Sequence, residues 1–291
     1  MTSDAGAERL AGGAERAAGG AERAAGDVAR PEAVRVLRDG ATASIVLSRP
    51  DRMNAWNDSL GRELLAAIRR AAADDGVRAV LITGDGRAFS SGADLIEGTG
   101  LTPEGHPDVY RALTQRYHPI ITGIREMPKP VVAAVNGAAA GIGLSLALAC
   151  DLVVAAESAY FLLAFSRVGL VPDGGSSMLV PARIGFARAA ELALLGERLP
   201  ARTALEWGLI NRVWPDEEFA GRARELLGRL AAGPTLSYGG IKRQLNRWLY
   251  DRMDAQLEFE ARIQREMAAS ADFADGVAAF ADKREARFNG R

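Results

Sequence analysis

The chain has 291 residues, enough for one large domain or two small ones with a substantial hydrophobic core. Its 48% apolar and 25% charged residues are typical of a soluble globular protein, and a net charge of −1 gives no basic surface for nucleic acid or a membrane. The single cysteine, Cys150, excludes an intramolecular disulfide framework, no apolar run reaches the ~20 residues of a membrane span, and the start has no signal-peptide pattern, so we expect a cytoplasmic protein.

The first segment, residues 1–31, stands apart from the rest because it contains a seven-residue repeat. GAERLAG, GAERAAG and GAERAAG follow one another from Gly6 to Gly26. The paired glycines at each junction argue against a coiled coil, since each glycine costs about 1 kcal/mol in a helix. One glutamate per arginine in each repeat also argues against a mitochondrial presequence. We therefore expect a disordered tail with transient helix.

The folded part is predicted to begin near Val34 with alternating strands and helices. Asn57 or Asp58 is the expected helix cap, because both side chains can accept a hydrogen bond from the first helical turn. In chain order, the pattern predicts a strand at 43–47, a helix at 58–73, a strand at 79–83, a glycine-punctuated turn at 84–94, a mobile glycine- and proline-containing loop at 98–107 and a helix at 108–126.

The most informative stretch is KPVVAAVNGAAAGIGLSLALACDLVVAA, residues 129–156. It predicts a buried strand at 131–135, a small-residue turn at 136–143, an apolar helix at 144–150 and a second strand at 152–155. Such a turn lets another backbone or a ligand come close, and it leaves the first N–H groups of the helix free to bind an anion or a developing oxyanion. A tightly packed turn with no ligand is the alternative reading of the same residues.

The last part of the chain is predicted to be mostly helical after a strand near Tyr160 and a third glycine-rich turn at 169–177. The alternation before it indicates an α/β core with parallel strands and right-handed crossovers. Cys150 is expected to be a buried structural thiol at a helix end. One helical stripe could cover the body or pack on another subunit, and its members are Phe259, Ile263, Met267, Phe273, Val277 and Phe280.

No familiar nucleotide or hydrolase motif is present. The turn GDGRAFSSG lacks the Gly-Lys-Ser/Thr of a P-loop, no Rossmann fingerprint follows a strand, and GxSxG is absent. The two histidines, His106 and His118, are too few to propose a metal site. The remaining candidates for a functional site are backbone donors and acidic side chains near them, such as Asp173. The alternative role for Asp173 is structural, namely to brace a glycine turn.

Four segments in a fixed order resemble the enoyl-CoA hydratase/isomerase (crotonase) superfamily: RPDRMNAW, GRAFSSGADL, KPVVAAVNGAAAGIG and ERLPARTALEWGLINRV. The resemblance covers about Val34 to the C-terminus. It implies a ββα spiral core at 32–232, a C-terminal helical trimerisation region at 233–291, and a homotrimer or hexamer. It also implies acyl-CoA thioester substrates, with coenzyme A as part of the substrate and no further cofactor.

The resemblance also implies site residues. The oxyanion hole would be the backbone N–H groups of Ala93 and Ile142, which would hold the thioester oxygen as it becomes an enolate. A solvated surface charge is the alternative role for Arg49 and Lys283. The positions that would contact substrate or coenzyme A are Arg49, Met53, Ala55, Asp94, Leu95, Ile96, Gly141, Phe165 and Lys283.

The departures from the family pattern bear on the reaction. Hydratases of this family carry glutamates at the positions of Ser145 and Phe165, and neither residue can activate water. Asp173, in GLVPDGG, matches the acid/base of the ring-1,2-epoxyphenylacetyl-CoA isomerase branch, and an apolar pocket near Leu163 and Phe165 would raise its pKa. The resemblance therefore favours a shift of a double bond or the opening of an epoxide, with Asp173 as acid/base.

The sequence leaves several alternative functions open. One is an enoyl-CoA hydratase, and another is a dehalogenase-like or natural-product enzyme acting on a CoA or carrier-protein thioester. His118 lies near a histidine of the dehalogenases, although capping or packing is the simpler role for it. A non-catalytic acyl-CoA binder is a different class, and RNA binding is disfavoured by the net charge of −1.

Overall fold

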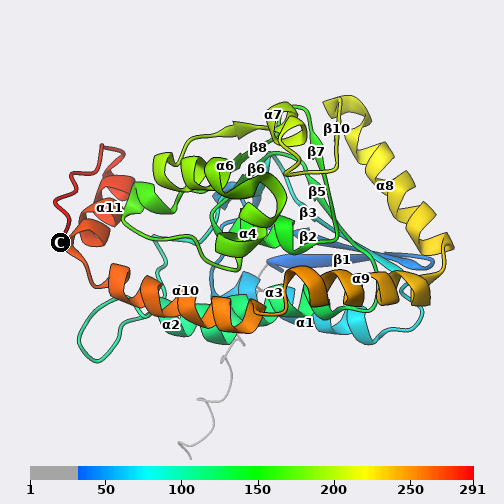
Figure 1. The fold of residues 1–291 in the computed structure, drawn as a ribbon, viewed down its shortest axis with the longest axis horizontal. Helices are drawn as coiled ribbons and strands as arrows, with labels where there is room; N and C mark the ends of the chain where they lie inside the picture. Colours follow the sequence, from blue (N-terminus) through cyan, green and yellow to red (C-terminus); the bar gives the residue numbers. More distant parts are fainter. Residues whose placement is uncertain (1–31) are drawn as a thin grey trace, which may run out of the picture. The chain divides into compact units, whose positions relative to one another are not determined.

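Two sheets organise the protein in the computed structural model, which describes residues 32–291 (Figure 1). The six-stranded sheet has the order β1-β2-β3-β5-β7-β10, and the four-stranded sheet has the order β4-β6-β8-β9. The repeat predicted as a tail lies outside the described residues. The strands are β1 (Val34–Asp39), β2 (Thr42–Leu47), β3 (Ala79–Gly84), β4 (Ala88–Ser90), β5 (Val131–Val135), β6 (Ala138–Ala140), β7 (Leu152–Ala156), β8 (Tyr160–Leu162), β9 (Leu199–Pro200) and β10 (Arg212–Trp214).

Helices follow each pair of strands as far as β8, and in residues 215–291 the helices follow β10 with no strand between them. The α-helices are α1 (Asp58–Ala73), α2 (Val109–Ala112), α3 (His118–Glu126), α4 (Ile142–Ala149), α5 (Ser176–Leu179), α6 (Pro181–Leu195), α7 (Ala201–Glu206), α8 (Asp216–Ala232), α9 (Thr235–Leu249), α10 (Met253–Ala268) and α11 (Ala271–Asp282). Short 3₁₀ helices are η1 (Pro50–Arg52) and η3 (Phe165–Val168), and a π-helix, η2 (Leu113–Tyr117), joins α2 to α3.

The chain winds through the two sheets as a ββα spiral, which confirms the predicted fold. Strands β3, β5 and β7 each enter the large sheet, and the strand after each one, β4, β6 or β8, enters the small sheet before the chain turns into helices. Pairing is parallel from β2 through β10 in the large sheet, and only β1 is antiparallel there. Parallel pairing was expected from the alternation of strands and helices.

Two strands lie inside segments that the sequence predicts as turns. β4 falls within 84–94 and β6 within 136–143, so those predictions were wrong in part. The three alanines of β6 lack the β-branched side chains that are typical of strands. Glycines beside the short strands let neighbouring backbone segments come close. A Cβ added to Gly84 would lie 2.1 Å from the Ala88 carbonyl oxygen, and one added to Gly137 would lie 2.2 Å from that of Arg87.

The apolar helix α4 is the centre of the core. All eight of its residues are buried, as expected from its continuous apolar sequence. Cys150, which follows it, is fully buried as predicted, and burial raises the pKa of its thiol to about 12. Of the two residues predicted to cap α1, Asn57 is the cap: its side chain, not that of Asp58, accepts a 3.0 Å hydrogen bond from the Leu60 N–H.

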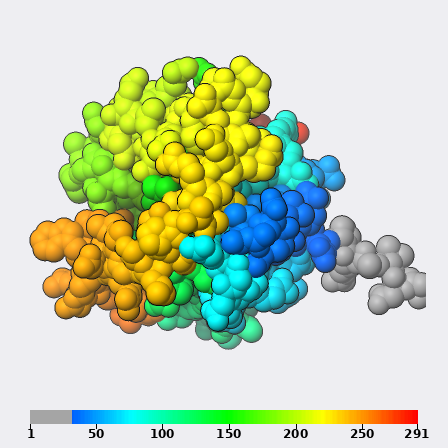
Figure 2. Space-filling model, turned by 90° about the vertical axis from the view of Figure 1, so that its right-hand side faces the viewer, coloured from blue at the N-terminus to red at the C-terminus, as the bar shows by residue number. Residues whose placement is uncertain are grey.

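The C-terminal helices lie on the same body. On the face shown in Figure 2, α8 (yellow) and α9 (yellow to orange) are at the surface beside the strands in blue. Buried Lys242 of α9 donates a 2.7 Å hydrogen bond to Asp151, which ties that helix to the core. Leu236 and Trp248 of α9 remain 93% and 85% exposed. No helix within residues 32–291 combines the length and apolar character needed to cross a membrane.

The stripe predicted on the last helices is divided between two helices, and its packing on another subunit stays a prediction. Helix α10 ends before Ser270, whose hydroxyl caps α11 by accepting a 3.0 Å hydrogen bond from the Phe273 N–H. Phe273 is buried, but Phe259 is 57% exposed. Helix α10 lies along α2 with a different face inward (Figure 1), made by Met253, Leu257, Glu260, Ala261, Gln264 and Ala268.

Candidate active site

Three glycine turns that are far apart in sequence meet at one place. A Cβ added to Gly92 would lie 3.0 Å from the Ala140 carbonyl oxygen and 3.8 Å from the Gly141 Cα. A Cβ added to Gly174 would lie 2.3 Å from Ile142 Cδ1. Because glycines alone allow these approaches, the turns that carry Ala93, Ile142 and Asp173 are packed against one another.

The two predicted oxyanion donors are free to bind an acceptor. Within residues 32–291, no backbone or side-chain acceptor takes a hydrogen bond from the Ala93 or Ile142 N–H. Ile142 begins α4, so its N–H lies at the positive end of the helix dipole. Gly141 before it has φ +52° and ψ −128°, a conformation that other residues rarely adopt. The geometry is therefore compatible with the predicted oxyanion hole.

The Ala93 segment is held by Trp56, a residue that the sequence did not single out. The Trp56 N–H donates to the Gly92 carbonyl over 2.8 Å, and the Asp94 N–H donates to the Trp56 carbonyl over 2.9 Å. The Trp56 ring meets the ring of Tyr117 edge-on at 5.1 Å between centroids. Tyr117 ends the π-helix, an irregularity that often marks a functional site.

Asp173 is a buried carboxylate with one bound and one free oxygen. Its Oδ2 accepts a 2.7 Å hydrogen bond from Gln264 Nε2. No group among the described residues donates to Oδ1, which is itself buried. The Ser145 and Ser176 hydroxyls donate to the Asp173 carbonyl over 2.7 and 2.8 Å, so the turn that carries the side chain is fixed.

The surroundings of Asp173 favour its neutral form. Burial raises the pKa of its carboxyl to about 8, and the nearby Glu260 carboxylate also raises it, whereas the Gln264 hydrogen bond lowers it. Leu163 and Phe165, which were predicted to make the pocket apolar, are both buried. An acid of this pKa can both accept and return a proton near neutral pH.

Glu260 is a second buried carboxylate that the sequence analysis missed. Its Oε2 accepts a 2.8 Å hydrogen bond from the Gly175 N–H, and its Oε1 accepts from the Ser177 N–H at 3.1 Å and from the Ser177 hydroxyl. Burial raises the pKa of Glu260 to about 7, against the lowering effect of these donors. Both of its oxygens are therefore occupied by the turn after Asp173.

The positions at which hydratases of this family carry glutamates also lie here. Ser145 is fully buried on α4, and a Cβ added to Gly174 would lie 3.0 Å from its Cβ. The Phe165 ring carbon Cζ would lie 3.8 Å from a Cβ added to Gly141. The structure thus places Phe165 beside Gly141, as predicted. The two positions at which hydratases carry glutamates, Ser145 and Phe165, hold no carboxylate here.

His118 packs inside the protein rather than capping a helix. It is the first residue of α3, and that helix has no side-chain cap. Burial lowers the pKa of its imidazole to about 4, so the ring is neutral near pH 7. Its buried Nε2 has no partner within residues 32–291. His118 is therefore a buried, neutral imidazole and not a helix cap.

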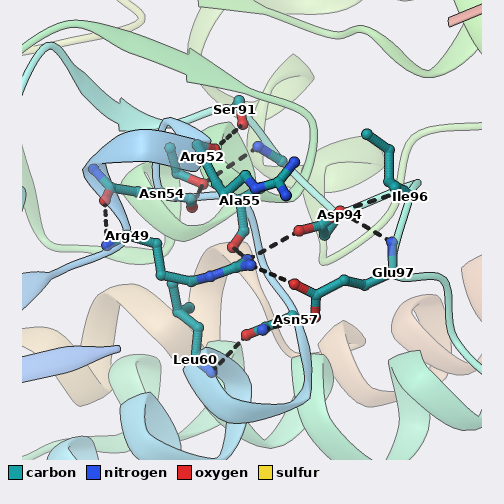
Figure 3. Close-up of polar contacts among 12 residues, drawn as sticks. Arg49, Arg52, Asn54, Ala55, Asn57, Leu60, Ser91, Asp94, Ile96 and Glu97 are labelled. Carbon is teal, nitrogen blue, oxygen red and sulfur yellow. Dashed lines mark hydrogen bonds and ion pairs between the residues drawn. The ribbon is translucent and has the colours of Figure 1, made fainter. Parts of the chain in front are cut away.

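The Arg49 guanidinium is largely buried and is bound by three groups of the protein (Figure 3). Its guanidinium donates to the Ala55 carbonyl over 2.6 Å, to Asp94 over 3.0 Å and to Glu97 over 2.6 Å. The side chain of Arg49 is 13% exposed and that of Asp94 is 6% exposed. Arg49 therefore holds the segment just after Ala93, and direct contact with coenzyme A stays a prediction for it.

We expect Arg49→Met to lower the free energy of unfolding by about 3 kcal/mol, because the buried Asp94 carboxylate would lose its cation. The matched control is Arg222→Met, which breaks an ion pair with Glu218 whose side chains are 52% and 45% exposed. Exposed pairs contribute about 0.5 kcal/mol or less. Urea unfolding of both variants measures the difference, and equal small losses would contradict the bracing role of Arg49.

Asn54, which the sequence analysis missed, completes this network. It is fully buried and adopts φ +55°, and Met53 before it adopts φ +51°. The Asn54 amide donates to the Asp85 and Ala88 carbonyls over 2.9 and 2.7 Å. Asn tolerates this left-handed conformation better than most residues, which is the only local signal that could have identified it.

The remaining predicted contacts are distributed around the Ala93 turn, with one exception. Ala55 is buried, Met53 and Leu95 are half-buried, and Ile96 is 65% exposed. Lys283 is exposed at the end of α11, and within residues 32–291 no hydrogen bond or ion pair connects it to the other candidates. No cluster suited to a metal ion occurs in that same range.

Comparison with known proteins agrees with this geometry. A family model described as enoyl-CoA hydratase/isomerase matches residues 38–291. The 1,2-epoxyphenylacetyl-CoA isomerase of Escherichia coli (strain K12) is 42% identical over 249 residues, 85% of this chain and 95% of the relative. A Rhodobacter capsulatus protein named "Probable enoyl-CoA hydratase" is 44% identical over 251 residues, 86% of this chain and 95% of the relative.

A solved structure gives the same answer for the fold. The crystal structure of an enoyl-CoA hydratase from Mycobacterium avium subsp. paratuberculosis matches with a TM-score of 0.81 and 37% identity, covering 88% of this chain and 98% of that one. The family model and the relatives span nearly all of the described residues, including the three glycine turns. The chain therefore belongs to the enoyl-CoA hydratase/isomerase family.

Proposed function

We propose that this enzyme shifts a double bond, or opens an epoxide, in an acyl-CoA thioester, with Asp173 as its acid/base. One observation carries the proposal: Asp173 Oδ1 has no hydrogen-bond partner among residues 32–291, and its turn packs on the turn of Ile142. Ser145 and Phe165 supply no second acid or base. The similarity to 1,2-epoxyphenylacetyl-CoA isomerase supports the same choice.

The proposed proton transfer needs one carboxylate and two backbone donors. Ionised Asp173 takes a proton from the carbon α to the thioester, and the electron pair of that C–H bond moves to the carbonyl oxygen as an enolate. The N–H groups of Ala93 and Ile142 stabilise the negative oxygen. Protonated Asp173 then returns the proton to the γ carbon while the double bond moves, so no proton or electron is gained or lost.

This chemistry supports the other parts of the proposal. Because the substrate is neither oxidised nor reduced overall, we propose no cofactor beyond the coenzyme A of the substrate. We further propose a cytoplasmic homotrimer or hexamer. The exposed apolar residues Leu236 and Trp248 on α9 and Phe259 on α10 support association between subunits.

Proton exchange in heavy water, followed by NMR, tests the proposal. The full-length protein is mixed with a 3-enoyl-CoA and, separately, with a 2-enoyl-CoA. We expect deuterium at the α or γ carbon together with a shifted double bond. Water added across the 2-enoyl double bond would instead indicate a hydratase. If neither thioester reacts, an epoxide substrate is tested next, and then a carrier-protein thioester. If the protein converts none of these but still binds acyl-CoA, it is a non-catalytic acyl-CoA-binding protein.

A further inference from the structure

Helix α10 presents two polar residues to the turn that carries Asp173. Glu260 and Gln264 are four residues apart, so they lie on one face of the helix. They are 3% and 0% exposed, within a stripe of buried apolar residues. Buried polar groups at such positions require partners, and both find them in residues 171–177.

The orientation of the Gln264 amide is fixed at both ends. Its Oε1 accepts a 3.3 Å hydrogen bond from the Val171 N–H, so its Nε2 must be the atom that faces Asp173. Nε2 donates to Asp173 Oδ2 over 2.7 Å. A neutral amide therefore holds one oxygen of the carboxylate, while Oδ1 has no partner in the described part of the chain.

We propose that Gln264 is a positioning residue for Asp173: it holds Oδ2, so that Oδ1 is the oxygen that exchanges the proton with substrate. This inference rests on the proposed function and adds α10 to the active site. Glu260 has a separate task, because it binds the N–H groups of Gly175 and Ser177 and so fixes the backbone of the same turn.

Among residues 32–291, two titratable groups, Glu260 and Tyr117, are coupled to Asp173 by charge. Glu260 faces it from α10 and disfavours its negative charge. Tyr117 approaches from η2, and the pKa of its phenol is raised by burial and then by the charge of Asp173. Among residues 32–291, Gln264 is the one group that donates a hydrogen bond to the ionised carboxylate, so its removal should shift the titration of Asp173 to higher pH.

The test is Gln264→Met, which keeps the length of the side chain and removes the amide. We expect kcat to fall about tenfold or more with KM within about threefold, because the base loses its orientation. We also expect the acid limb of the kcat/KM profile to move up by about one pH unit, the scale of one hydrogen bond to a charged group. A structural role alone would leave that midpoint in place.

The control is Gln256→Met on the same helix. Gln256 Nε2 donates to the Ser177 hydroxyl over 2.8 Å and has no hydrogen bond to Asp173. This variant is expected to keep the wild-type pH midpoint. Gln264→Leu is the second variant if Gln264→Met does not fold, and it should move the midpoint in the same direction because it also lacks the amide.

A second measurement separates this inference from the proposed function. The Asp173 carboxyl is titrated by ¹³C NMR in the free enzyme and assigned by its absence in Asp173→Asn. A higher midpoint in Gln264→Met or Gln264→Leu than in wild type supports the inference even if both thioesters prove unreactive. An unchanged midpoint, with wild-type kcat where the enzyme is active, would overturn it.

Discussion

Asp173→Asn should lower the rate of deuterium incorporation into the α and γ carbons by about 10³-fold, since a positioned acid/base contributes 10²–10⁴-fold. Asn has the same shape and can keep the hydrogen bond with Gln264, but it cannot take a proton. KM should change little, because the Ala93 and Ile142 N–H groups that we propose as thioester donors remain. NMR exchange in heavy water measures the rate directly.

The matched control for this loss is Asp275→Asn. Asp275 lies on α11 and bonds to Arg284 and to the Arg287 N–H, all of them exposed or only partly buried. Its replacement is expected to leave the exchange rate within about twofold. Residual activity above a tenth of wild type in Asp173→Asn would contradict the assignment and direct attention to Glu260 as the base.

The same Asp173→Asn variant should be more stable than wild type in alkaline solution. The pKa of Asp173 is about 8 in the folded protein, well above the ordinary value of about 4. The folded state therefore holds a proton that the unfolded chain loses between these values. The contribution of Asp173 to stability falls as the pH rises from 4 to 8, and the loss is complete above 8.

The expected size of this effect is large. Each unit of pKa shift corresponds to about 1.4 kcal/mol, so wild type gives up as much as about 5 kcal/mol at pH 9 that Asp173→Asn retains. Near pH 4 the two proteins should be nearly equally stable, because Asp173 is neutral in the folded protein and only about half ionised in the unfolded chain. Urea unfolding of both proteins at pH 4, 7 and 9 gives the difference.

Asp275→Asn is again the control, with the opposite sign. The Arg284 hydrogen bond holds the pKa of Asp275 below its ordinary value. Its contribution to stability is present above the ordinary pKa and is lost in acid, so its replacement gives no gain at pH 9. A constant difference between Asp173→Asn and wild type at all three pH values would show that the carboxylate is not destabilised by burial.

The sequence predicted those parts of the site that depend on local backbone chemistry. Three glycine turns were visible because glycine punctuates the pattern, and they hold Ala93, Ile142 and Asp173. The α/β alternation and the family resemblance predicted the spiral. The short strands β4 and β6 were missed, because alanines and glycines read as a turn when no neighbouring strand is known.

The sequence could not show which distant side chains complete the site. Glu260 and Gln264 were missed because the apolar residues Phe259 and Ile263, on another face of α10, give the stronger helical pattern. Two polar residues within the buried stripe were the available signal. Arg49 was predicted to contact the ligand. The sequence does not distinguish a surface arginine from one that is buried and paired, and only the structure shows the Asp94 carboxylate beside it.

The contact between Gln264 and Asp173 spans 91 residues of chain, and this has a consequence for synthesis on the ribosome. The oxyanion turns belong to segments that emerge early and can fold while translation continues. Asp173 gains its partner only after α10 has emerged and docked, a step that closes a long loop. A nascent or C-terminally clipped chain can thus form the spiral while the Asp173 carboxyl lacks its Gln264 partner, so we expect this contact to be completed last.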